Sequence, residues 1–236
     1  MKKQLFTILS ILLGLLSNAQ NNLPVDMVLV KSGTLEKKVN GNTSSNAKET
    51  FSDEIASFYM SATEVSVQDY KQFCKETEKN MPPEPDWGWG DPKKPMVNVT
   101  YADALAYCDW LSDKHGMSFT LPTHQQWEYA ARGGSLNNPD FINNKQLPNP
   151  FVIYIGNSNE KPECITCIQP NELGFYALCG NVWEWVLNGP RQQGHATVVG
   201  GSFFEGADQV QIDSHREYNK YLRRQDIGFR VVMNPE

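Results

Sequence analysis

The 236-residue sequence has no excess of positive charge and no long hydrophobic run beyond residue 16. Its 27 acidic residues outnumber 21 basic ones, and the formal net charge of −6 argues against a broad nucleic-acid surface. The lack of a later apolar run means that no transmembrane segment is expected beyond the N-terminus. No internal repeat is present. The five cysteines are an odd number, which leaves at least one thiol unpaired or intermolecular.

The first residues have the pattern of a secretory signal peptide. Lys2 and Lys3 precede an apolar stretch from Leu5 to Leu16, and small residues at 17–19 precede a cleavage site before Gln20. The apolar stretch is too short to span a bilayer as a helix. We therefore expect residues 1–19 to be removed, residues 20–236 to form the domain, and the protein to be periplasmic or extracellular.

The cysteines allow several kinds of chemistry. Cys164 and Cys167 form a CxxC motif, which is typical of a redox pair, half of a zinc site, or a disulfide that closes a loop. No second CxxC and no histidine pair at ligand spacing accompanies it, and a thioredoxin-like βαβ pattern is missing, so a loop disulfide is favoured. Cys74 and Cys108 lie on predicted helices, where they either pair or are small buried residues.

The hydrophobic pattern predicts a single α+β domain with short helices, short strands and long ordered loops. Apolar residues at helical spacing predict helices over 67–78, 101–115 and 125–132, the last with Thr123 as N-cap and Gln126 completing a capping box. Short apolar runs predict strands at 25–30, 58–60, 95–99, 198–203 and 227–232. The stretches between them predict loops, and loops this long in folded proteins are usually functional or held by ions and aromatic packing.

Separated strings carry the most specific signal in the sequence: MSATEVSVQDYKQF (60–73), PMVNVTYADALAYCDWL (95–111), LPTHQQWEYAARGG (121–134), NELGFYALCGNVWEW (171–185), GGSF (200–203) and GFRVV (228–232). In this order and spacing they closely resemble the formylglycine-generating enzyme family, also called sulfatase-modifying factors. The resemblance implies a compact single domain with a C-type-lectin-like fold. It also implies buried aromatic anchors (Trp127, Tyr129, Trp183, Trp185) and arginines held by fixed acceptors (Arg132, Arg216, Arg230).

The resemblance also shows which chemistry is missing. In the oxidase members, two cysteines after the GGS strand bind copper(I), activate oxygen and convert a sulfatase cysteine to formylglycine. Here the first position falls at Glu205 and the second near Val210, and no cysteine follows Cys179. Copper(I) prefers soft thiolate ligands, so a copper site and formylglycine-generating activity are not expected.

The calcium sites of the family are also reduced in this sequence. One would use the carbonyls of Gly180 and Val182 and the carboxylate of Glu184, but the Asn or Asp usual three residues before the glycine is Ala177. Losing one hard oxygen ligand weakens calcium binding. The second site, expected near residues 157–163, has no matching ligands. The sequence therefore predicts one weakened Ca²⁺ site.

Polar residues occupy the segment after the GGS strand, where the family has its active site. They are Glu205, Asp208, Asp213, His215 and Arg216. Glu205 suits a general base or a ligand for a harder metal, and His215 suits a second ligand or a proton shuttle. The alternative is an ordinary solvated loop.

The resemblance, together with these residues, implies two possible functions. The first is an exported domain without copper-dependent activity, acting as a cell-envelope binding or scaffold module with a protein or glycan partner. Relatives of this kind serve as structural components of bacterial envelope assemblies. The second is a metal-dependent oxidoreductase of the wider family with a replaced active site around Glu205 and His215. The missing cysteine pair favours the first function.

Overall fold

Two small sheets form the frame of the molecule, in a computed structural model that describes residues 26–38, 50–134, 151–187 and 194–235. The first sheet has the strand order β1-β4-β12-β5, with β1 (Met27–Val30), β4 (Phe58–Ser61), β12 (Val232–Met233) and β5 (Phe119–Thr120). The second has the order β10-β9-β8-β11, with β10 (His215–Asn219), β9 (His195–Val199), β8 (Trp183–Trp185) and β11 (Ile227–Gly228). The predicted signal peptide at 1–19 lies outside the described residues.

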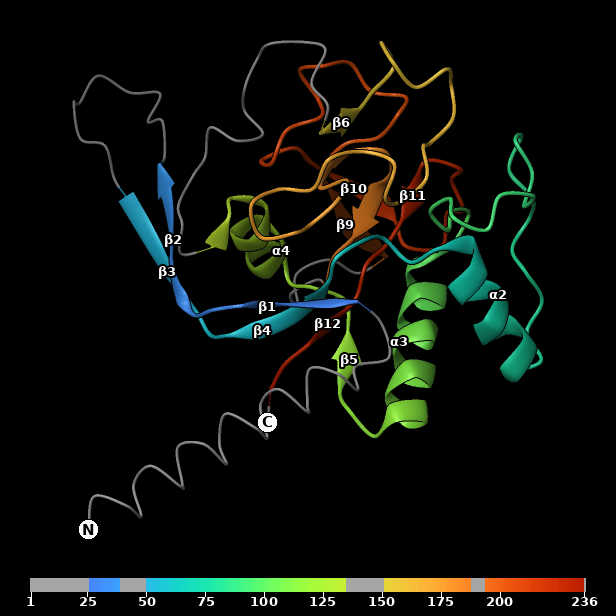
Figure 1. The fold of residues 1–236 in the computed structure, drawn as a ribbon, viewed down its shortest axis with the longest axis horizontal. Coiled ribbons are helices and arrows are strands. Elements are labelled where there is room, and N and C mark those ends of the chain that lie inside the picture. The colour runs from blue at the N-terminus through green and yellow to red at the C-terminus, as the bar shows by residue number, and fades with distance from the viewer. Residues whose placement is uncertain (1–25, 39–49, 135–150, 188–193, 236) are drawn as a thin grey trace, which may run out of the picture.

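The three predicted helices are confirmed as α2 (Val67–Glu76), α3 (Tyr101–His115) and α4 (His124–Ala131). Each begins after a side chain that accepts a hydrogen bond from a backbone N–H three residues later: Ser66, Thr100 and Thr123. In α3 and α4 the residue at that third position bonds back, which completes a capping box. α2 and α3 lie side by side at one side of the molecule (Figure 1).

The two sheets share their last segment of chain. The strand predicted at 227–232 is in fact two strands, because β11 pairs with β8 in one sheet and β12 pairs with β4 and β5 in the other. The strand predicted at 95–99 is wrong. Met96 donates its N–H to Val65 and Asn98 donates to Arg224, in an irregular segment that is buried on several sides. Burial, and not strand pairing, accounts for the apolar run.

Large aromatic residues fill the core, as predicted. Trp127, Trp183 and Trp185 are fully buried, and Tyr129 is 2% exposed. One apolar cluster packs α2 and α3 against the second sheet, and another surrounds α4 and the first sheet. The indole N–H groups of Trp127 and Trp183 donate to the carboxylates of Glu184 and Glu205, and these two residues therefore help to position the polar side chains described below.

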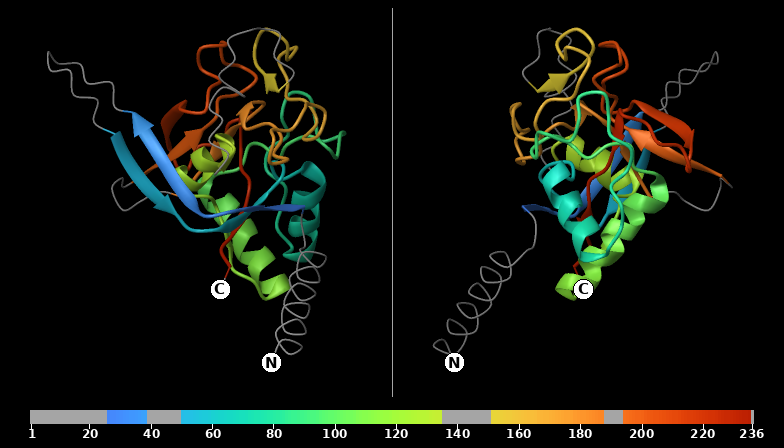
Figure 2. Two further views of the ribbon diagram at one scale, coloured as in Figure 1. Left: turned by 60° about the vertical axis from the view of Figure 1, so that its left-hand side comes forward. Right: turned by 90° about the vertical axis from the view of Figure 1, so that its right-hand side faces the viewer.

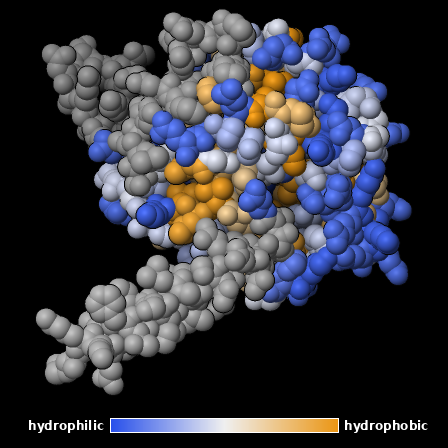
Figure 3. Space-filling model, in the orientation of Figure 1, coloured by the Kyte–Doolittle hydropathy of each residue, from blue (hydrophilic) through white to orange (hydrophobic). Residues whose placement is uncertain are grey.

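Short paired segments outside the two sheets were not predicted. The hairpin of β2 (Gly33–Lys38) and β3 (Thr50–Ile55) extends from one side of the molecule, away from α2 and α3 (Figures 1 and 2). β6 (Val152–Ile153) pairs in parallel with β7 (Cys179–Gly180). An apolar patch is visible in the region of β1, where Leu29 is 38% exposed (Figure 3). Within the described ranges, no helix has the length and apolar character needed to cross a bilayer.

The prediction that the CxxC motif forms a disulfide within a loop is confirmed. Cys164 and Cys167 form a disulfide. The alternative that Cys74 and Cys108 pair with each other is wrong, because both are free and buried, as is Cys179. Burial raises the pKa of the Cys108 and Cys179 thiols, so both stay protonated and unreactive at neutral pH.

Candidate functional site

A tight glycine turn carries the chain from β9 into the candidate site. Gly200 and Gly201 have φ angles of 89° and 85°, in the region that favours glycine. A Cβ on Gly200 would lie 2.6 Å from the carbonyl oxygen of Leu178, and one on Gly201 would lie 2.6 Å from that of Gln209. β9 therefore ends at Val199, four residues before the end predicted from the sequence. The turn places Phe203 in the core and leaves Phe204 37% exposed.

Glu205 follows this turn and binds an arginine with both carboxylate oxygens. Arg216 of β10 donates from Nη1 to Oε1 at 2.6 Å and from Nη2 to Oε2 at 2.8 Å. The Trp183 indole donates to Oε1 at 3.2 Å, and the guanidinium carbon lies 5.1 Å from the centre of the Trp183 ring. The side chain of Glu205 is 13% exposed and that of Arg216 is 36% exposed. The carboxylate is thus fixed and neutralised at the edge of the core.

The pair continues into a row of arginines and aromatic rings, here called the arginine–aromatic row: Trp183, Arg216, Tyr218 and Arg224. Arg216 and Tyr218 lie on the same face of β10, and Arg224 lies 5.0 Å from the centre of the Tyr218 ring. Arg224 also binds Asp226 through Nε and Nη2 at 2.8 and 2.9 Å. Each arginine of the row therefore binds one carboxylate and contacts at least one aromatic side chain.

An open cleft of about 440 Å³ adjoins the end of this row. Its walls combine acidic, basic and amide side chains with the exposed ring of Phe204; the lining residues are Glu84, Asp86, Asn98, Phe204, Arg223, Arg224, Gln225 and Asp226. Gln225 and Asp86 bind each other across it, with Nε2 of Gln225 donating to Oδ2 of Asp86 at 2.9 Å. The cleft is suited to a polar ligand with one apolar face.

The structure does not bring Glu205 and His215 together. Successive side chains of a strand point to opposite faces, so Arg216 turns toward Glu205 and His215 turns away. The His215 ring is exposed and lies 5.4 Å from the ring of His124 on α4. Its Nδ1 lies 3.0 Å from the carbonyl oxygen of Asp213. A joint acid–base or metal role for Glu205 and His215 has no support in this geometry.

The side chains at the two copper positions do not fit copper(I). Glu205 offers hard oxygens that already bind Arg216, and Val210 is a buried hydrocarbon side chain 5% exposed. Among the described residues, no group of three or more His, Cys, Asp or Glu side chains is arranged to hold a metal.

The proposed calcium donors do not fit that ion either. The Glu184 carboxylate is buried, and Arg230 donates to it from Nε and Nη2, both at 2.6 Å. The Trp127 indole donates to the same carboxylate at 2.8 Å. Glu184, the one charged member of the expected Gly180–Val182–Glu184 set, is therefore engaged by a cation of the protein itself, and Ala177 supplies no side-chain oxygen.

A second buried carboxylate beside this pair was missed from the sequence. Glu64 is 2% exposed; its Oε1 accepts a hydrogen bond from Nδ2 of Asn181 at 2.9 Å, and its Oε2 has no partner in the structure. Burial, together with the nearby Glu184 carboxylate, raises the pKa of Glu64 to about 8. The available signal was a carboxylate within the otherwise small and apolar start of the 60–73 string.

Asn181 connects this buried group to the candidate site. It adopts a positive φ of 58°, its Oδ1 accepts from the Glu163 N–H at 2.9 Å, and its carbonyl accepts from the Phe203 N–H at 2.8 Å. One buried side chain and its backbone thus tie together Glu64, the 163 loop and the segment that leads into Glu205.

Known proteins resemble this chain in sequence. It is 33% identical over 155 residues to inactive C-alpha-formylglycine-generating enzyme 2 of Bos taurus, covering 58% of this chain and 50% of that protein. The corresponding mouse protein is covered to 48%, so the chain spans about half the length of these relatives. Chaperone protein LppX of Paenibacillus barcinonensis is 24% identical over 262 residues, covering 88% of this chain and 89% of that protein.

Solved structures share the fold. PvdO from Pseudomonas aeruginosa superposes with a TM-score of 0.75 at 21% identity, covering 89% of this chain and 94% of that one. CarF superposes with a TM-score of 0.74 at 20% identity, covering 91% and 100%. Residues 14–235 match the profile of the sulfatase-modifying factor enzyme 1-like domain. The chain therefore belongs to the family defined by the sulfatase-modifying factor enzyme 1-like domain.

Proposed function

We propose that this chain is an exported family member without copper-dependent formylglycine-generating activity, acting as a binding or scaffold module in the cell envelope. The observation that carries the proposal is the ion pair between Glu205 and Arg216 at the first copper position. Two soft thiolates are needed there, and a paired carboxylate and a buried valine stand in their place. Relatives named as inactive formylglycine-generating enzyme 2 support a member of this kind.

Export and binding rest on further observations. The pattern at residues 1–19 is that of a signal peptide, and the Cys164–Cys167 disulfide suits an oxidising compartment. The relative named as a chaperone covers most of the chain, and chaperones bind other proteins. We propose that the partner, a protein or a glycan, binds at the cleft beside Phe204, where an exposed ring and paired polar groups lie together.

Copper binding and turnover test the loss of activity directly. The purified chain is titrated with copper(I) against a chelator of known affinity, and a cysteine peptide of the sulfatase type is followed by mass spectrometry. We expect no stoichiometric copper and no formylglycine. Stoichiometric copper or iron that is lost in Glu205→Ala but kept in Glu36→Ala, an exposed control on β2, would establish the oxidoreductase instead.

Cell fractionation and envelope binding test the remaining part of the proposal. We expect the mature chain to begin at Gln20 and to occur outside the cytoplasm, where it associates with the envelope fraction. Phe204→Ala and Arg223→Ala should each lower the amount of protein bound to the envelope fraction at least tenfold. Glu36→Ala is the control and should leave that amount unchanged. Retention of residues 1–19, or equal association of all variants, would contradict the proposal.

A further inference from the structure

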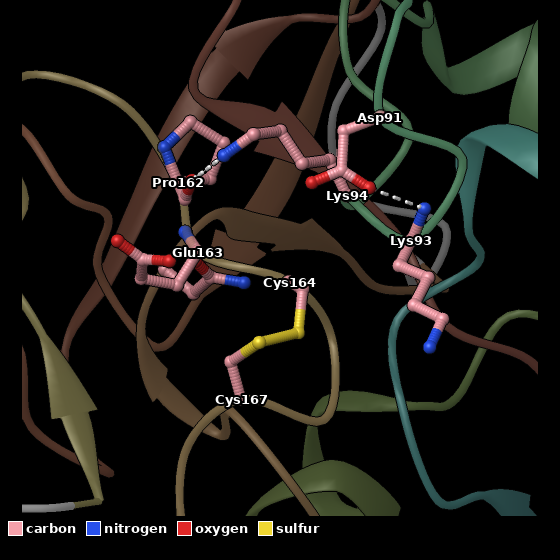
Figure 4. Close-up of a disulfide and its surroundings, with 8 residues drawn as sticks. Asp91, Lys93, Lys94, Pro162, Glu163, Cys164 and Cys167 are labelled. Atoms are coloured by element: carbon pink, nitrogen blue, oxygen red, sulfur yellow. Dashed lines mark hydrogen bonds between the residues drawn. A yellow bond between two sulfur atoms is a disulfide. The ribbon is translucent and has the colours of Figure 1, made fainter.

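The disulfide between Cys164 and Cys167 lies on the surface beside a second loop. Cys167 is exposed and Cys164 is half-buried. Figure 4 shows the pair next to residues 91–94, to which its loop is attached. The Ile165 N–H donates to the Lys93 carbonyl at 2.9 Å, and Nζ of Lys94 donates to the Pro162 carbonyl.

A structural role alone explains this disulfide poorly. The two cysteines are separated by three positions, and the turn is already closed by the Cys167 N–H, which donates to the Cys164 carbonyl at 3.0 Å. The entropic stabilisation given by a disulfide grows with the length of the loop it closes, so a loop this short gains little. Exposed disulfides are also the ones most accessible to attack by a thiolate.

The same loop supports the segment that contains Glu205. Before the disulfide, the Ile155 N–H donates to the Glu205 carbonyl at 3.0 Å, and Oγ of Ser158 donates to the Phe203 carbonyl at 3.0 Å. Immediately next to Cys164, the Glu163 N–H donates to Oδ1 of Asn181 at 2.9 Å. Asn181 in turn accepts from the Phe203 N–H. A single hydrogen bond therefore connects the disulfide loop to Asn181, which in turn holds the segment that leads into Glu205.

We infer that Cys164–Cys167 is a reversible redox site, reduced by a dithiol partner, whose state controls the order of the loop that holds Phe203 and Glu205. A thiolate of the partner attacks Sγ of the exposed residue Cys167, the S–S bond breaks, and the Cys164 thiolate leaves and takes up a proton. The second thiol of the partner, as its thiolate, then attacks the mixed disulfide and frees Cys167. Two electrons and two protons pass to the protein, and the partner becomes a disulfide.

The folded protein provides its own monitor for the chemical part of this inference. Cys74, Cys108 and Cys179 are buried free thiols, and only unfolding should expose them. The oxidised protein is incubated with dithiothreitol under native conditions, trapped with iodoacetamide and weighed. We expect two alkyl groups, one on Cys164 and one on Cys167. Five alkyl groups appearing together, or none before unfolding, would overturn the inference.

Hydrogen exchange tests the coupling to the site. On reduction, and equally in the Cys164→Ser/Cys167→Ser double variant, the amides of Ile155, Glu163 and Phe203 should exchange at least tenfold faster. The amides of α3 serve as the control and should not change. Unchanged exchange at the amides of Ile155, Glu163 and Phe203 would overturn the inferred coupling between the disulfide and the candidate site. Neither measurement depends on the proposed binding partner. The redox inference can therefore fail while the proposed function holds, and the reverse is also true.

Discussion

Arg230 and Arg216 both bind carboxylates through paired hydrogen bonds, but in different surroundings. Arg230 and Glu184 are 0% and 1% exposed, whereas Arg216 and Glu205 are 36% and 13% exposed. Removing one partner of a buried pair leaves an uncompensated charge in the core, and this costs far more than the loss of a pair that water reaches. The two pairs therefore have different roles: the first holds the fold, and the second shapes a surface.

We expect Arg230→Ala to lower the free energy of unfolding by about 3–5 kcal/mol. Arg216→Ala, its matched control, should lower it by about 1 kcal/mol. Urea unfolding followed by tryptophan fluorescence measures both, since indoles lie against both pairs. Equal losses of unfolding free energy in the two variants would show that burial does not make the Arg230–Glu184 pair more important for stability than the Arg216–Glu205 pair.

Glu64 predicts a dependence of stability on pH. Its pKa is about 8 in the folded protein, above the ordinary value of 4.5. Between these values the folded state binds more protons than the unfolded state, so this group lowers stability as pH rises and has its least unfavourable effect below about pH 4.5. Glu64→Gln keeps the acceptor for Asn181 and removes the titration.

The stability of Glu64→Gln relative to the wild type should therefore increase from pH 5 to pH 8, by on the order of 1 kcal/mol per pH unit. Urea unfolding at each pH unit measures this difference. Glu36→Gln, at an exposed position, should show a constant difference from the wild type over the same range. A flat profile for Glu64→Gln would mean that Glu64 is ionised in the folded protein.

At the scale of elements, the turn after β9 is fixed by its glycines. A side chain at Gly200 would meet the Leu178 carbonyl and the Trp127 ring at a φ of 89°. Gly200→Ala should cost about 2 kcal/mol or more and disturb the adjoining Glu205 segment. Gly90→Ala is the control, because a Cβ there meets nothing within 4 Å, and it should stay within about 0.5 kcal/mol. Thermal unfolding of the two variants checks this prediction, and equal midpoints would contradict it.

Elements with a local chemical signal could be predicted from the sequence, and elements defined by distant partners could not. Both α3 and α4 were predicted, and each begins with a capping box formed within four residues, at Thr100 and Thr123, although only the box at Thr123 was predicted. β10 has the sequence HREYN, which has no apolar face, and its pairing with β9 decides its conformation. The same register decides that Arg216, and not His215, meets Glu205. Spacing along the chain carries no information on that choice.

At the scale of the whole molecule, a cation of the protein occupies the carboxylate expected to bind calcium. We expect the unfolding temperature to be the same, within about 1 °C, in a chelator and in about 10 mM calcium. A site with a dissociation constant of about 100 µM would stabilise the fold by about 2.7 kcal/mol under these conditions and raise that temperature by several degrees. Differential scanning calorimetry distinguishes the outcomes, with magnesium at equal concentration as the ionic control. A rise that is specific to calcium would contradict the conclusion that Gly180, Val182 and Glu184 do not fit calcium.

The position of β12 has a consequence for the order of folding. Residues 232 and 233 lie between β4 and β5, where they pair with residues 59–60 on one side and 119–120 on the other. The first sheet therefore stays open until β12 has left the ribosome, more than 100 residues after β5, and contacts so distant in sequence form slowly. A chain that cannot complete this sheet during synthesis stays unfolded for longer, and an unfolded chain can pass through a membrane channel. Such a delay suits a protein that, as proposed, crosses a membrane before it folds.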